Sequence, residues 1–344
     1  MVGFGAWILC GLFLDSWAHL HLASALETLF TPWHFVFYGG YLACAAFLLT
    51  IAWRNHARGH AWRDALPPGY ELCLAGVAIF AFGAILDVFW HLRFGIEKSF
   101  EALYSPTHMI VWVGMGLIIA GPLRAAWRRP GSPVQSVRAQ LPALVSMALL
   151  FALTAAFSQH FNPFYIPWAS QPTRPATQLP PNIVEQWNYL IYALGLSSVV
   201  VQTAILMGFL LAALRRGLLP VGAISLILGI DMLLFNASML PAALAGGIAG
   251  DMLLAWLHPT PERVGRFRLF AFCTPLALYV FYYAEVALAR GGIWWPVHLW
   301  VGSIGLAGIT GIMVSFLVVP PARDRDVPDQ ASAIASTVSE RSYR

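Results

Sequence analysis

A pattern of acidic residues, histidines and prolines occurs twice near the start of this chain. In each copy an Asp lies four positions before a His. A Glu then lies seven positions before a second His, and this second His ends a Pro-x-His triplet. The first copy comprises Asp15, His19, Glu27, Pro32 and His34. The second comprises Asp87, His91, Glu101, Pro106 and His108. The chain has only 16 acidic residues and 10 histidines in 344, so a repeat in these residue types carries far more information than a repeat in apolar ones.

The spacing predicts that each copy gathers its side chains at one level. Residues four apart on a helix lie on the same face, so each Asp should sit beside the His that follows it. The pairs Thr31-Pro32 and Ser105-Pro106 are typical helix starts, with a hydroxyl at the N-cap and proline at the first position. His34 and His108 should then lie in the first turn of the next helix, and each copy becomes a helical hairpin with one carboxylate and two imidazoles.

Two imidazoles and one carboxylate form a three-ligand set with open positions, which suits non-haem iron, copper or zinc. We therefore predict metal ligation by one set from each hairpin, in one dinuclear or two mononuclear sites. The predicted ligands are Asp15, His19 and His34, with Asp87, His91 and His108. Three other interpretations stay open: structural Asp–His pairs that hold the hairpins together, a metal-free relay of protons or substrate, and haem ligation by a pair such as His19 and His91.

Other polar residues are candidates for supporting roles. Glu27 and Glu101 lie near the hairpin turns and are the predicted catalytic residues, as acid or base, although a fourth ligand or an orienting group would fit the same positions. His160 and His298 fall at helix ends on the same predicted side, so we include them among the metal ligands. Asp231 and Asp251 fall inside apolar runs; they predict either a proton path from the cytoplasm or helix caps.

The composition of the chain indicates that it is surrounded by lipid. It is 59% hydrophobic and 10% charged, with a mean hydropathy of +0.68, whereas a soluble domain carries about 25% charged residues. Such a chain cannot cover its surface with polar groups, so its main partner is the lipid bilayer. The formal charge of +4 does not predict nucleic-acid binding, because the arginines sit in short loops between apolar runs.

Apolar runs bounded by charge or proline predict an all-α, polytopic integral membrane protein with about ten transmembrane helices. Residues 1–319 form a single membrane domain, and 320–344 form a disordered cytoplasmic tail. Within the domain, 3–53 and 70–127 are tandem duplicated hairpins. The other spans lie in 141–319, with one broken helix near 241–257. The predicted spans are 3–22, 33–53, 70–92, 107–127, 141–161, 184–214, 219–240, 242–257, 268–289 and 296–319.

The basic residues predict the orientation. Most of the 20 Lys and Arg residues follow the even-numbered spans or lie in the tail, and loops rich in Lys and Arg stay in the cytoplasm. We therefore expect a multi-pass protein of a bacterial-type inner (plasma) membrane, with both termini cytoplasmic and the metal site toward the outer face. The loop 162–183 on that side is rich in proline, which predicts either a lid over the site or a solvated linker.

The Asp-x3-His motif with a further His resembles a metal motif on the membrane helices of the copper-containing membrane monooxygenases, Asp-x3-His-x12-His. Here 14 residues separate His19 from His34, and 16 separate His91 from His108; that family also carries its motif once. The resemblance implies copper rather than iron or zinc, and oxidoreductase chemistry on O2 or a small substrate. The alternatives are a metal-ion or small-solute transporter and a non-catalytic component that binds other membrane subunits of a redox complex.

Overall fold

The computed structural model describes residues 1–22, 31–95, 97, 100–128, 137–172 and 180–321, apart from the side chains of residues 19, 20 and 137. The described residues form helices joined by turns and loops, and they contain no β-strand. The α-helices are α1 (Val2–His21), α2 (Pro32–Ala57), α3 (Glu71–Phe94), α4 (Phe100–Tyr104), α5 (Pro106–Ile119), α6 (Gly121–Trp127), α7 (Val137–Phe157), α8 (Pro181–Arg215), α9 (Ala223–Phe235), α10 (Leu240–Leu257), α11 (Val264–Ala289) and α12 (Val297–Val318). Within the described residues, short 3-10 helices occur between them: η2 (Trp62–Asp64), η3 (Gln159–Phe161), η4 (Trp168–Ser170) and η5 (Ala237–Met239).

Seven described helices are long and apolar enough to cross a membrane, and the pair α5–α6, bent by 48°, makes up to eight. Each predicted span coincides with a helix or with this bent pair. However, α1, apolar over Val2–Ala18, and α9 are shorter, so the count of ten stays a prediction. Helix α10 runs without interruption from Leu240 to Leu257, and the interruption lies before it, at η5. Large apolar side chains such as Leu42 and Phe89 are more than 60% exposed, which fits contact with lipid.

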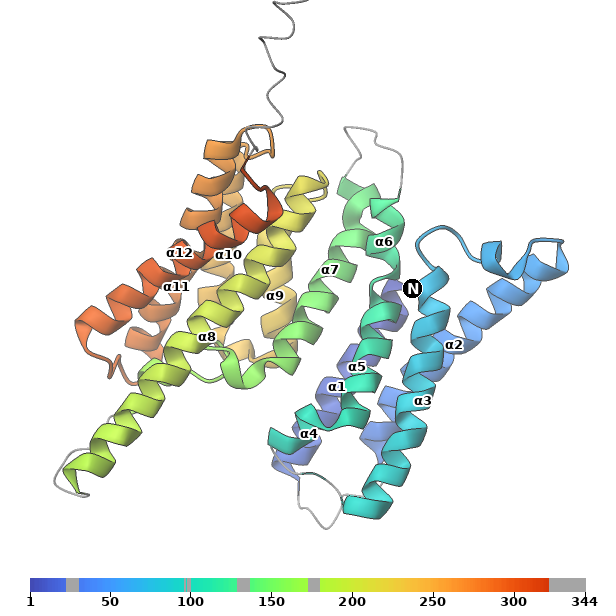
Figure 1. The fold of residues 1–344 in the computed structure, drawn as a ribbon, viewed down its shortest axis with the longest axis horizontal. Helices are drawn as coiled ribbons and strands as arrows, with labels where there is room; N and C mark the ends of the chain where they lie inside the picture. The colour runs from blue at the N-terminus through green and yellow to red at the C-terminus, as the bar shows by residue number, and fades with distance from the viewer. Residues whose placement is uncertain (23–30, 96, 98–99, 129–136, 173–179, 322–344) are drawn as a thin grey trace, which may run out of the picture.

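The helices pack around two hydrophobic cores. The first hairpin, α1–α2, and the second, α3–α5, surround one core, and α7 to α12 surround the other. Helix α7 contributes to both, because Leu149 and Leu153 belong to the first core while Met147 and Phe151 belong to the second. Figure 1 shows α7 between the two halves accordingly.

Equivalent glycines bring the two helices of each hairpin together. A Cβ atom at Gly40, six residues after His34, would lie 3.0 Å from the Ile8 nitrogen of α1. One at Gly114, six residues after His108, would lie 2.7 Å from the Phe80 nitrogen of α3. Only glycine permits such close backbone approach, as at helix interfaces in membranes.

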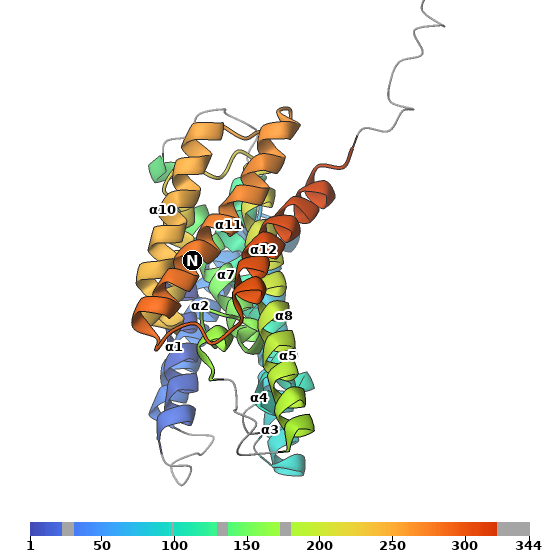
Figure 2. The ribbon, with the colours of Figure 1, turned by 90° about the vertical axis from the view of Figure 1, so that its left-hand side faces the viewer.

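The polar repeats meet at one end of the bundle. Figure 1 shows the C-terminal ends of α1 and α3 at the same end of the bundle as the N-terminal ends of α2 and α5, and Figure 2 also shows α1 and α3 ending there. The arginine-bearing ends of α6 and α8 lie at the opposite end. One end of the molecule thus carries the Asp and His residues, and the other carries basic residues.

Candidate metal centre

The last turns of α3 supply an acid and an imidazole. Asp87 and His91 lie one turn apart on the same face, and His91 Nε2 is 3.1 Å from Asp87 Oδ2. The helix ends after Phe94 because Gly95 has a φ of 87°, a conformation that favours glycine. Asp87 is buried, with 8% exposure, so its carboxylate needs polar or charged partners.

The start of α5 supplies the second imidazole. Ser105 is the N-cap and accepts a hydrogen bond from the His108 backbone N–H, with Pro106 following in the first turn. This cap holds His108 with its Nε2 atom 3.3 Å from Asp87 Oδ1. The neighbouring Thr107 hydroxyl donates to the same Oδ1 over 2.6 Å. Asp87 therefore meets groups from both helices of the hairpin, as the spacing predicted.

The two imidazoles are each oriented by a contact at their other ring nitrogen. His108 Nδ1 lies against the carbonyl oxygen of Ala102, which can only accept a hydrogen bond. His91 Nδ1 is 3.2 Å from the Gly95 carbonyl oxygen and 3.1 Å from Glu97 Oε2. Both Nδ1 atoms thus face acceptors, which favours the tautomer with the proton on Nδ1 and leaves both Nε2 atoms directed at Asp87. Metal-binding histidines are held in this way by a carbonyl or carboxylate behind the ring.

A positive charge between the three side chains would stabilise this arrangement. In the neutral tautomer with a proton on Nδ1, each Nε2 presents a lone pair. Two lone pairs would then point at the oxygens of the buried Asp87 carboxylate, which is repulsive. Protons added between these atoms, or one metal cation, would resolve this repulsion.

The separations suit a metal ion. With metal–ligand bonds of about 2.0–2.2 Å, neighbouring ligand atoms at a tetrahedral ion lie about 3.4 Å apart. The two Nε2–Asp87 separations are 3.1 and 3.3 Å, and one ligand atom from each of the three residues lies within 4.8 Å of the others. Two nitrogen ligands make Zn²⁺, Fe²⁺ or Cu²⁺ more suitable than Mg²⁺ or Ca²⁺, which prefer oxygen.

The first hairpin repeats part of this geometry. Thr31 is the N-cap of α2 and accepts from the His34 backbone N–H. Its hydroxyl also lies 2.6 Å from His34 Nδ1, and His34 Nε2 is 3.4 Å from Asp15 Oδ1. The Asp15–His34 contact therefore corresponds to the Asp87–His108 contact. The side chain of His19 and the whole of Glu27 lie outside the part of the chain that the structure describes.

Tyr38 connects the two hairpins. It lies on α2, one turn after His34, and the two rings are 6.2 Å apart between centroids. Its hydroxyl is within electrostatic reach of both Asp87 and Asp15. The carboxylates of both clusters thus act electrostatically on one side chain, which the sequence pattern did not single out.

An open cleft of about 510 Å³ lies against the second hairpin. Glu101 of α4 is exposed and lines this cleft, but the carboxylate that contacts an imidazole is Glu97. The repeated Glu-x6-His spacing predicts Glu101, whereas no pattern in the sequence singles out Glu97. The cleft is lined by Trp90, Phe94, Gly95, Glu97, Phe100, Glu101, Tyr104, Ser105 and Pro106.

Among the described residues, the metal-competent group contains Asp87, His91 and His108 and does not include His160 or His298. His160 lies in η3 with its ring 4.8 Å from that of Phe100, between centroids. Burial lowers the pKa of His160, and its Nε2 makes no hydrogen bond in the described structure. His298 is exposed in the first turn of α12.

The two acidic residues of the C-terminal half have different surroundings. Asp251 of α10 accepts hydrogen bonds from the backbone N–H groups of Ile224 and Ser225, over 3.1 and 3.0 Å, and from the Ser225 hydroxyl. It therefore caps the N-terminus of α9, where a negative charge is stabilised. Asp231 of α9 is just as deeply buried, with 2% exposure, and has no such role.

No protein-family model, curated protein or solved structure matches this chain. Its function must therefore be argued from the geometry of its own residues.

Proposed function

We propose that this chain is a multi-pass membrane metalloprotein that binds a transition-metal ion through Asp87, His91 and His108. The observation that supports this most is the orientation of the two imidazoles. Both Nε2 atoms converge on one buried carboxylate while both Nδ1 atoms face other acceptors. Two independent helix ends produce this arrangement, and a metal ion satisfies all three ligands at once.

We further propose that the two hairpins are duplicates and that the first one holds a second metal, with Asp15, His34 and His19 as ligands. The shared Asp–His contact, the shared hydroxyl caps and the equivalent glycines support this. Tyr38 is within electrostatic reach of the Asp15 and Asp87 carboxylates. This supports the proposal that the two metal sites influence each other. A stoichiometry of two metals per chain is then expected.

The chemistry we propose is oxidoreductase-type, on O2 or a small substrate. A three-ligand site leaves coordination positions open, so a bound metal would supply a Lewis-acid or redox centre there. The neighbouring cleft offers aromatic walls and two carboxylates, Glu97 and Glu101, which can accept or deliver protons. Copper is the proposed metal, on the resemblance of the Asp-x3-His motif.

The proposed location is the inner membrane of a bacterial-type cell, with ten spans, both termini in the cytoplasm and the site near the outer face. The separation of the arginine-bearing helix ends from the site end supports this orientation. A fluorescent protein fused to the C-terminus should fold and fluoresce, because the C-terminus is expected in the cytoplasm. Alkaline phosphatase is active only outside the cytoplasm, so an active phosphatase fusion at the C-terminus would show the opposite orientation.

Elemental analysis of the purified protein tests metal binding directly. Wild-type protein should retain a stoichiometric transition metal. The double variant H91A/H108A should lose the metal ion that is bound by the second hairpin. The matched control is H60A, which removes an exposed imidazole outside both clusters. Optical and paramagnetic-resonance spectra would then identify the metal and would reveal a haem by its Soret band. Metal-free wild-type protein that stays metal-free after incubation with Cu²⁺, Fe²⁺ and Zn²⁺ would leave the Asp–His contacts as purely structural ion pairs.

A further inference from the structure

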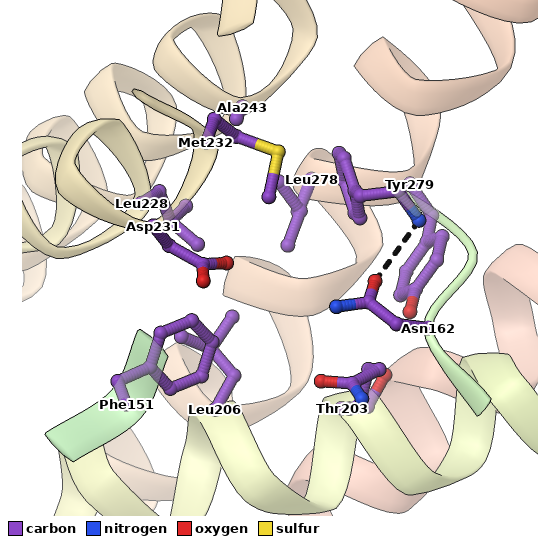
Figure 3. Close-up of a pocket in the computed structure, with 12 residues that line it drawn as sticks. Phe151, Asn162, Thr203, Leu206, Leu228, Asp231, Met232, Ala243, Leu278 and Tyr279 are labelled. Carbon is purple, nitrogen blue, oxygen red and sulfur yellow. Dashed lines mark hydrogen bonds between the residues drawn. The ribbon is translucent and has the colours of Figure 1, made fainter. Parts of the chain in front are cut away.

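A small internal cavity in the C-terminal half contains a carboxylate with an unsatisfied oxygen. It is lined by residues of α7, α8, α9, α10 and α11 and of the segment after η3. Asp231 is 2% exposed, and its Oδ1 atom makes no hydrogen bond in the described structure. Figure 3 shows this carboxylate directed into the cavity, opposite Asn162 and Thr203.

The other polar groups around the cavity are mostly engaged elsewhere. Asn162 Oδ1 accepts from the Phe164 backbone N–H, and Gln202 Nε2 donates to the Ser158 hydroxyl over 2.7 Å. The Tyr279 hydroxyl is directed at the Val199 carbonyl oxygen. Thr203 is buried, and its hydroxyl interacts with the Tyr279 side chain without forming a hydrogen bond of good geometry.

The cavity has no cationic side chain to balance an ionised Asp231. Its lining contains no Lys, Arg or His, and Tyr279 of α11 is the other titratable residue that faces it. A buried carboxylate without a counter-charge is strongly unfavourable, and such groups normally take up a proton. The volume of about 20 Å³ is enough for one water molecule, which needs at least about 10–15 Å³.

We propose that Asp231 is a proton-binding site inside the membrane domain, protonated at neutral pH and hydrogen-bonded through one water to Thr203. This site is separate from the candidate metal centre, since it lies in the other core and shares no residue with it. Intramembrane carboxyl groups of this kind are typical of proton relays and proton-coupled transport. The companion residue Asp251 does not take part, because its oxygens already accept hydrogen bonds from the start of α9.

Infrared spectroscopy of the purified protein in lipid nanodiscs tests this proposal. At neutral pH the wild type should show a carbonyl stretch from a protonated carboxyl group that shifts with ¹³C-labelled aspartate. The D231N variant should lose this component, while the control D64N, which changes an exposed aspartate of η2, should keep it. The component should also move in D2O, because a proton-binding site must exchange with solvent.

Asn resembles a neutral Asp in shape, so D231N should melt at the wild-type temperature. If D231N does not fold, labelled D231E serves instead: it keeps a carboxyl group but should lose the aspartate-specific component. A spectrum in which D231N changes nothing would overturn the proposal, as would a component that never exchanges in D2O. Ionised Asp231 with stabilisation by Na⁺ in the wild type but not in D231N would identify a cation site instead, and would also overturn it.

Discussion

The hydrogen bond from Thr107 to Asp87 allows a sharp test of the metal centre, because Thr107 is not itself a ligand. Replacing it with Val keeps the shape of the side chain and removes only the hydroxyl. That hydroxyl donates over 2.6 Å to Asp87 Oδ1, and it fixes the carboxylate for both imidazoles. The expected result of T107V is weaker metal binding with the ligand set intact.

The magnitude follows from two independent considerations. A hydrogen bond to a charged group contributes about 1.5–3 kcal/mol. Loss of a group that orients a ligand typically costs about 10- to 100-fold in metal affinity, which corresponds to about 1.4–2.8 kcal/mol. The two ranges agree, so we expect the dissociation constant to rise by about one to two orders of magnitude.

The assay is competition with a chromophoric chelator, using protein in detergent. The matched control is T274V, because Thr274 is also buried in a helix but its hydroxyl makes no hydrogen bond in the described structure. T274V should therefore bind metal like the wild type. If T107V retains wild-type affinity while H108A loses the metal, the carboxylate is not held by Thr107. If neither variant changes the affinity, the ion binds elsewhere.

Three further predictions test the fold, and each uses one or two substitutions. Alanine at Gly114 places a Cβ atom 2.7 Å from backbone of α3 and should cost about 1–3 kcal/mol in thermal unfolding, whereas alanine at Gly116, with 3.9 Å to its nearest neighbour, should be neutral or stabilising. D251A leaves two backbone N–H groups at the start of α9 without an acceptor, so it should destabilise by at least about 2 kcal/mol, and an unchanged melting temperature would refute the capping role. Burial lowers the pKa of His160, so its imidazole binds a proton more readily in the unfolded chain than in the folded one. The free energy of unfolding should therefore fall as the pH drops below about 6.5, and H160Q should reduce this pH dependence.

The sequence predicted the helices well because hydropathy and capping act locally. Each run of apolar residues became a helix, and the hydroxyl–proline pairs before His34 and His108 became N-caps. The contacts of Asp87 followed from the same local rules. What could not be predicted were contacts that depend on how a chain reverses direction. Glu97 Oε2 lies 3.1 Å from His91 Nδ1 although the two residues are six apart in the chain, and no periodicity specifies that contact.

Lateral packing was the other unpredictable quantity. The pairing of helices decides which polar residues meet, and an apolar stripe on a helix does not name its partner. Asp231 and Asp251 looked alike in the sequence, both being acids within apolar runs. The structure separates them because α10 places Asp251 beside the free N–H groups of α9, while Asp231 faces a cavity. For the same reason, no sequence pattern related Tyr38 to both hairpins.

Helix α7 is the shared wall of two cores that otherwise have little in common. Side chains on one face of it fill the half with the histidine clusters, and side chains on another face fill the half with Asp231. A tilt or rotation of this one helix would therefore repack both halves together, since neither core can absorb the displacement alone. Metal binding at the imidazoles and protonation of the distant Asp231 carboxyl group would then be coupled through the position of α7.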